Sequence, residues 1–194
     1  MHKKVIITII LTSAILAACT SSRDKSIDRI NSLESRIYSE KAVAFNKTSS
    51  DSLLKMYEDY IVQFPSDSLA PVYLFRAANL TMTAGDGNKA ISLLDQFIQK
   101  YPGHPKAPVC LFFKAFVYEN LLRNLPMARE NYLLYIEKFP DGEFVKDANM
   151  SVRNLGKTPE QMIMEFEAMQ KYDSVRKADS IANLKGKKAN KTKG

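Results

Sequence analysis

Few side chains in this sequence have the chemistry that catalysis or metal binding requires. The chain has only two histidines and two cysteines. His104 lies in a segment with two nearby prolines, where no neighbour would orient it as a general base. Cys110 falls inside an apolar helical segment and is expected to be buried rather than reactive. We therefore predict no catalytic residue, no metal site, no cofactor and no enzymatic activity.

Cys19, the other cysteine, lies where a lipid could be attached. A positively charged start precedes Val5–Ala18, an uncharged segment shorter than the roughly 20 residues of a spanning helix and typical of a signal peptide. Its end, Leu16-Ala17-Ala18-Cys19, resembles the lipobox of bacterial lipoproteins. The resemblance implies removal of residues 1–18, acylation of Cys19 with palmitate or a similar chain, and a tether over residues 19–25. The alternative is an ordinary signal peptide, or a short membrane anchor with a chance cysteine.

The residue after Cys19 bears on which membrane the protein occupies. Thr20 stands where enteric lipoproteins retained at the inner membrane have aspartate. The lipoprotein resemblance therefore favours the outer membrane. No acidic cluster of the kind linked to surface export follows directly, so we expect the protein to face the periplasm.

The positive charge of the chain is concentrated near its C-terminus. The formal net charge is +7. Seven basic residues lie in residues 176–194 against the single acidic Asp179: Arg176, Lys177, Lys185, Lys187, Lys188, Lys191 and Lys193. The segment has no aromatic residue on which a nucleic-acid base could stack, so we predict no nucleic-acid partner. We expect a disordered basic tail, with contact to anionic lipid, lipopolysaccharide or cell wall as the alternative.

The middle of the chain is repetitive. Three nearly equally spaced aromatic-proline pairs divide it: Phe64-Pro65, Tyr101-Pro102 and Phe139-Pro140. The first two are followed by similar phrases, residues 70–78 and 107–115, and each pair is preceded by a helical pattern of apolar residues. Asp86 and Asn124 are suitable helix N-caps. The pattern predicts a repeated unit of helix, turn, helix and proline.

This unit resembles the tetratricopeptide repeat. Ala90 and Ala128 match the small residue of its second helix, and a proline closes each unit. The extra loop residues Gly103–Lys106 are similar to those in envelope lipoproteins of the BamD and YbgF (CpoB) kind, most closely the small tetratricopeptide lipoproteins of the Bacteroides group. The resemblance implies an all-α, right-handed solenoid of antiparallel helix pairs over residues 26–175, with a capping helix at each end. The apolar pattern predicts an amphipathic helix within residues 26–45 that packs on the first repeat, and it places Phe144 in the apolar stripe of the next-to-last helix. The closing helix is expected to have this apolar face: Met162, Ile163, Phe166, Met169 and Tyr172. A short coiled coil is the alternative for the first cap.

The resemblance also implies a binding surface, because the first helices of such repeats line a concave groove that holds a peptide or a helix. By position, the groove residues are Val72, Phe75, Asn79, Met82, Val109, Phe112, Phe116 and Asn120. Plain core packing is the alternative role of each. We therefore predict a lipid-anchored scaffold that binds a protein or peptide partner in envelope or outer-membrane assembly. The alternative function is a structural spacer that links the outer membrane to an anionic surface through the basic tail.

Overall fold

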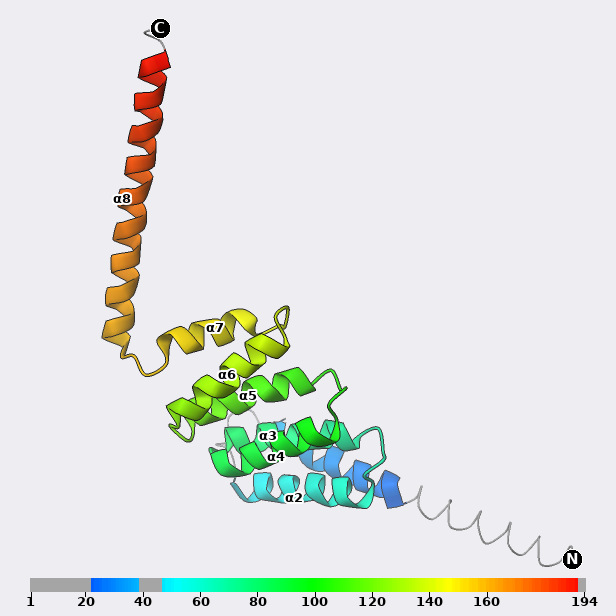
Figure 1. Cartoon of the computed structure of the whole chain (residues 1–194). Helices are drawn as coiled ribbons and strands as arrows, with labels where there is room; N and C mark the ends of the chain where they lie inside the picture. Colours follow the sequence, from blue (N-terminus) through cyan, green and yellow to red (C-terminus); the bar gives the residue numbers. More distant parts are fainter. Residues whose placement is uncertain (1–21, 39–46, 192–194) are drawn as a thin grey trace, which may run out of the picture. The chain divides into compact units, whose positions relative to one another are not determined.

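The computed structural model of the protein describes residues 22–38 and 47–191, and these ranges contain helices and turns but no strand. The predicted signal peptide and Cys19 lie outside them. A helix over residues 22–38 is followed by seven others (Figure 1): α2 Lys47–Gln63, α3 Ala70–Thr83, α4 Gly87–Lys100, α5 Ala107–Asn120, α6 Leu125–Lys138, α7 Val145–Asn154 and α8 Pro159–Lys191. The predicted all-α class is confirmed. Residues 22–25, expected in the tether, form the first turn of helix 22–38.

The chain divides into two compact units at Asn149 and Met150. In the first unit, consecutive helices from α2 to α6 pack against each other and run in opposite directions (Figure 1). The turns between α2 and α3 and between α4 and α5 therefore lie on one edge, and the α3–α4 turn lies on the other.

Local sequence signals explain where these helices start. The Asp86 carboxylate accepts a hydrogen bond from the Lys89 amide at 3.0 Å, and the Asn124 side chain accepts one from the Met127 amide at 3.2 Å. Both residues are thus N-caps, as predicted, and satisfy amides that would otherwise lack a partner. Prolines occupy the first turns of α3, α5 and α6, where no amide hydrogen is needed.

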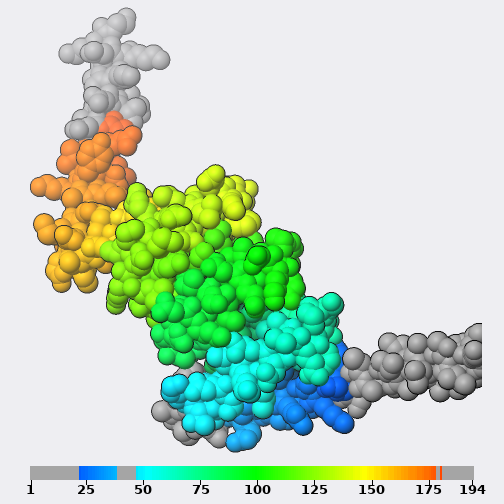
Figure 2. Space-filling view, turned by 60° about the horizontal axis from the view of Figure 1, so that its bottom comes forward, coloured from blue at the N-terminus to red at the C-terminus, as the bar shows by residue number. Residues whose placement is uncertain are grey.

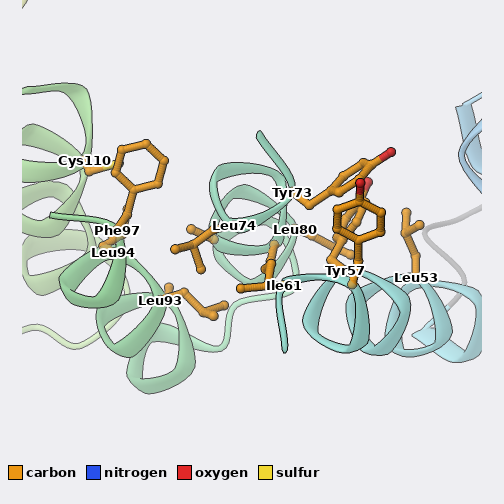
Figure 3. Close-up of a cluster of buried hydrophobic side chains, with 14 of the residues drawn as sticks. Leu53, Tyr57, Ile61, Tyr73, Leu74, Leu80, Leu93, Leu94, Phe97 and Cys110 are labelled. Carbon is orange, nitrogen blue, oxygen red and sulfur yellow. The ribbon is translucent and has the colours of Figure 1, made fainter. Parts of the chain in front are cut away.

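Small and aromatic side chains fill the core of the first unit. Ala90 and Ala128 are fully buried, which lets their helices approach closely, as predicted. Tyr57 and Tyr73 stack with ring centroids 5.5 Å apart in the core, which Figure 3 shows together with Leu74 and Phe97. Cys110 is also buried in this cluster.

Helix 22–38 covers one side of this core. Ile30 is only 1% exposed, and Ile27, Leu33 and Ile37 pack around the same cluster. In Figure 2 its atoms lie directly against those of α2. The prediction of an amphipathic helix that packs on the first repeat is confirmed for residues 26–38, whereas residues 39–45 lie outside the described ranges.

The second unit contains α8, which begins with a reciprocal capping box. The Thr158 amide donates to Gln161 Oε1 at 2.9 Å, and the Gln161 amide donates to Thr158 Oγ1 at 3.3 Å. The side chains expected to give this capping helix its packing face are all exposed: Met162, Ile163, Phe166, Met169 and Tyr172.

The prediction of a disordered tail from residue 176 is wrong for residues 176–191, because α8 continues to Lys191. This stretch has no proline and only one glycine, and an existing helix extends at little further free-energy cost. Residues 192–194 lie outside the described ranges. Within those ranges, no helix combines the length and the hydrophobicity that crossing a bilayer requires.

Candidate functional site

An apolar cleft of about 390 Å³ lies on the first unit, between α3, α5 and the turn before α7. Its lining comprises Phe75, Asn79, Met82, Thr83, Lys106, Val109, Phe113, Glu143 and Phe144. Phenylalanines from α3, from α5 and from the turn before α7 thus meet at one opening. We call this opening the α3–α5 cleft.

Four of the eight residues predicted for a groove line this cleft together: Phe75, Asn79, Met82 and Val109. They come from α3 and α5, as the predicted groove requires. Val72, Phe116 and Asn120 do not line it. Phe116 is 40% exposed, and Asn120 is exposed at the end of α5, so both lie on the surface outside this cleft.

Phe112 was predicted to face the groove, and this prediction is wrong. Its ring packs inward, 5.5 Å from the Tyr132 ring and 4.6 Å from the stacked Phe144 ring, and its residue is 8% exposed. The next residue, Phe113, lines the cleft instead, and its ring stacks 6.2 Å from that of Phe75 at an interplanar angle of 17°.

Two contacts hold the Phe75 ring in position, one with Phe97 and one with Lys106. The ring forms an edge-to-face pair with the buried Phe97 ring, with centroids 6.1 Å apart. The Lys106 ammonium nitrogen lies 5.5 Å from the centroid of the Phe75 ring. A cation–π contact of this kind contributes about 0.5–1 kcal/mol at an exposed site. Lys106 therefore shields Phe75 only in part and leaves a charge at the opening.

The third wall of the cleft depends on the turn before α7. The Phe144 amide donates to the Tyr135 hydroxyl oxygen at 3.0 Å, which fixes the turn on α6. Gly142 lies directly beside this contact, since a Cβ at that position would be 2.5 Å from the same oxygen. The close approach requires glycine, and it holds Phe144 against Phe112.

The groups with possible chemistry lie elsewhere and are engaged in structure. Burial raises the pKa of the Cys110 thiol to about 12, so the thiol is protonated at neutral pH. The His104 Nδ1 atom accepts a hydrogen bond from the Lys106 amide at 3.1 Å, and its ring packs edge-on to Phe97. Among the described residues, no group of three histidine, cysteine or acidic side chains is arranged to hold a metal ion.

Sequence reasoning missed five lining residues, of which the two aromatic ones are Phe113 and Phe144. Phe113 aligns with Arg76 of the preceding repeat, which suggests a solvent-facing position rather than a cleft. Phe144 was assigned to the apolar stripe of the following helix, but it lies in the turn before α7 begins. The one available signal was the double phenylalanine Phe112-Phe113, where the earlier repeat has a single one. No protein-family model and no curated protein matches the chain.

Proposed function

We propose that the protein is a lipid-anchored, periplasm-facing scaffold of the tetratricopeptide type, which binds a protein or peptide partner in the α3–α5 cleft and acts in envelope or outer-membrane assembly. The observation that carries this proposal is the open cleft itself. Phe75, Phe113 and Phe144 leave apolar surface accessible at one place, although the neighbouring aromatic rings are buried in the core.

The size and charge of the cleft favour a particular kind of partner. Its volume is at the lower end of the roughly 300–1,000 Å³ range of ligand pockets. This suits one or two large apolar side chains of a peptide better than a large cofactor. Lys106 and Glu143 contribute one charge of each sign to the lining. We therefore expect an apolar anchor residue flanked by both acidic and basic side chains.

Photo-cross-linking in living cells tests the cleft. A photoreactive amino acid at Asn79, which lines the cleft, is compared with the same amino acid at Asn120, which is exposed outside it. We expect a defined protein adduct from position 79 and none from position 120. Phe113→Ala should remove the adduct, because buried aromatic anchors dominate binding energies. Phe116→Ala, one turn further along α5, is the matched control and should leave it unchanged. Equal adducts from both positions would contradict the proposal.

The anchor is tested separately at Cys19. Metabolic labelling with a palmitate analogue should mark the wild type, and Cys19→Ser should abolish both the label and the cleavage after residue 18. Normal processing and membrane retention of this variant would refute the lipoprotein part of the proposal while leaving the cleft untouched.

The spacer function is a second candidate, which the length of α8 favours. Its 33 residues correspond to about 50 Å of helix, and basic residues are concentrated in its last turns. If this function is the main one, removal of residues 176–194 should release the protein's contact with anionic membranes or cell wall, and raised salt should do the same because exposed charges are screened. In that case, a partner that cross-links at position 79 should not be needed for this contact.

A further inference from the structure

The first turn of helix 22–38 is clasped to the turn between α2 and α3. Arg23 Nε lies 2.5 Å from Asp67 Oδ2, and Arg23 Nη2 donates to Asp67 Oδ1 at 3.3 Å. The Asp67 carboxylate also accepts a hydrogen bond from the Leu69 amide at 2.8 Å. Beside this pair, the Gln63 side chain donates to Ser22 Oγ at 3.2 Å. A two-point contact of guanidinium with carboxylate fixes direction as well as distance.

The same helix is held at two further points. Ile30, in its middle, is buried in the core. Near its far end, the Glu34 carboxylate accepts hydrogen bonds from the Tyr57 hydroxyl at 2.5 Å and from Arg76 Nη1 at 2.7 Å. Because both ends and the middle are attached to α2, α3 and their turn, helix 22–38 does not hinge freely on the first unit.

The distance from this clasp to the predicted lipid is short. Cys19 precedes Ser22 by three residues. An extended chain spans at most about 3.3–3.6 Å per residue, so the acylated cysteine must lie within roughly 11 Å of Ser22. The polar headgroup layer on each side of a bilayer is itself about 5–8 Å thick. A lipid held at Cys19 therefore brings Ser22 to the headgroup surface.

The surface around the clasp is suited to contact with lipid headgroups. Val62, in the last turn of α2, is 80% exposed, which is unusual for an aliphatic side chain in a helix of this unit. Three further exposed residues lie in the two segments that the clasp joins. Lys25 is in the first turn of helix 22–38, and Pro65 and Ser66 are in the turn between α2 and α3. The surface is uncharged at Val62 and Pro65, and the first turn of helix 22–38 carries one exposed charge of each sign, Asp24 and Lys25. The Lys25 ammonium would meet phosphate groups.

We propose that the surface formed by the first turn of helix 22–38 and by residues 62–68 contacts the lipid headgroups, and that the Arg23–Asp67 clasp sets the orientation of the first unit on the membrane. This inference rests on the lipid anchor of the proposed function. It goes beyond that function because it defines which face of the protein meets the bilayer. The edge with the α2–α3 turn lies nearest the membrane. The α3–α4 turn, at the other end of α3, is farther away by up to the length of that helix, 14 residues or about 21 Å (Figure 1).

Fluorescence quenching measures this orientation directly. The full-length lipoprotein is reconstituted in nanodiscs, with an environment-sensitive probe at Ser66→Cys or at Ala84→Cys. Both positions are exposed, on opposite edges of the unit, and the buried Cys110 does not compete for the label. A lipid with a spin label on its headgroup is the quencher. We expect strong quenching at position 66 and at least several-fold weaker quenching at position 84.

Two variants test whether the short tether and the Arg23–Asp67 clasp cause the difference in quenching between positions 66 and 84. Insertion of ten glycine and serine residues between Thr20 and Ser21 should reduce quenching at position 66 to the level seen at position 84. Arg23→Gln should reduce the difference between the two positions, whereas Arg29→Gln, an exposed residue of the same helix outside its first turn and outside the clasp, should preserve it. Equal quenching at positions 66 and 84, or no change on insertion, would overturn the inference.

The lipid content of the same sample distinguishes the two proposals. Intact-mass analysis reports whether Cys19 carries its acyl chains. A lipidated protein that shows no preference for position 66 refutes the orientation but leaves the anchor standing. A protein without lipid refutes the anchor, and the orientation with it.

Discussion

Lys106→Phe should close the α3–α5 cleft and stabilise the protein at the same time. Lys106 and Phe144 occupy equivalent places, since each precedes a helix of the repeat and each carbonyl accepts the amide four residues later, from Cys110 and Ala148 respectively. Phe144 covers the Phe112 ring at 4.6 Å and 16°. A phenylalanine ring at position 106 would reach the Phe75 ring as the Phe144 ring reaches that of Phe112, and it would cover the Phe75 ring in the same way.

The expected change in the free energy of unfolding follows from the two contacts that are exchanged. The variant loses the contact of Lys106 with the Phe75 ring, which contributes about 0.5–1 kcal/mol. It gains a stacked aromatic pair that contributes about 0.5–1.5 kcal/mol beyond the burial of its area. Burial of previously exposed apolar surface adds about 25 cal/mol per Å². The net result is a stabilisation of about 1 kcal/mol, which raises Tm by roughly 2–4 °C in a protein of this size.

Urea unfolding followed by circular dichroism measures the stability, and cross-linking from Asn79 measures the partner. The variant should be more stable and should lose the adduct. Lys100→Phe is the control, because Lys100 is an exposed lysine in the last turn of α4 that does not line the cleft. It should neither stabilise the protein nor affect the adduct. If Lys106→Phe is destabilised, or keeps the adduct, the equivalence of the two turns or the role of the cleft is refuted.

Three other predictions concern the supports of the fold. Gly142→Ala should destabilise the protein by about 2 kcal/mol in urea unfolding, because its Cβ displaces the Tyr135 hydroxyl, whereas Gly103→Ala, with open space around it, should change stability by less than about 1 kcal/mol. In native peptide mapping, Cys110 should resist thiol reagents at pH 8, since burial raises its pKa to about 12. Asp67→Asn should lower the unfolding free energy at pH 7 by at most about 1 kcal/mol. The guanidinium partner lowers the pKa of Asp67 from 3.8 to about 2, so this difference should disappear as the pH falls through that interval.

Much of the fold could be predicted because it depends on local rules. Asp86 and Asn124 cap their helices, and the buried Ala90 and Ala128 follow from the spacing of small residues within an apolar stripe. The helical state of residues 176–191 could not be predicted, because a high density of like charges is also typical of disordered segments. In a helix that already exists, each added residue needs only its own propensity, and salt weakens the repulsion between like charges.

The cleft was harder to predict, because α5 is apolar on nearly every side. Val109, Leu111, Phe112 and Val117 are all buried, and Phe113 is half-buried beside them. A helix that is hydrophobic all round has no periodicity that distinguishes a core face from a binding face. The choice between Phe112 and Phe113 was therefore made from the alignment of repeats. That alignment identifies what the repeats share, whereas Phe113 differs from its equivalent Arg76 in residue type, with an apolar ring in place of a charged side chain.

The open cleft is a consequence of this departure from repetition. The turn before each first helix presents one side chain to the helix pair behind it: Leu69 packs against the core, Lys106 lies over Phe75, and Phe144 stacks on Phe112. Two of the three are apolar and extend the core, but the middle one is a lysine, which cannot bury its charge. Phe75 is left partly accessible at that point, and Phe113 adds apolar surface beside it. A protein that needed only a rigid spacer would gain stability from an apolar residue at position 106. The lysine instead keeps the α3–α5 cleft open, as the proposed partner site requires.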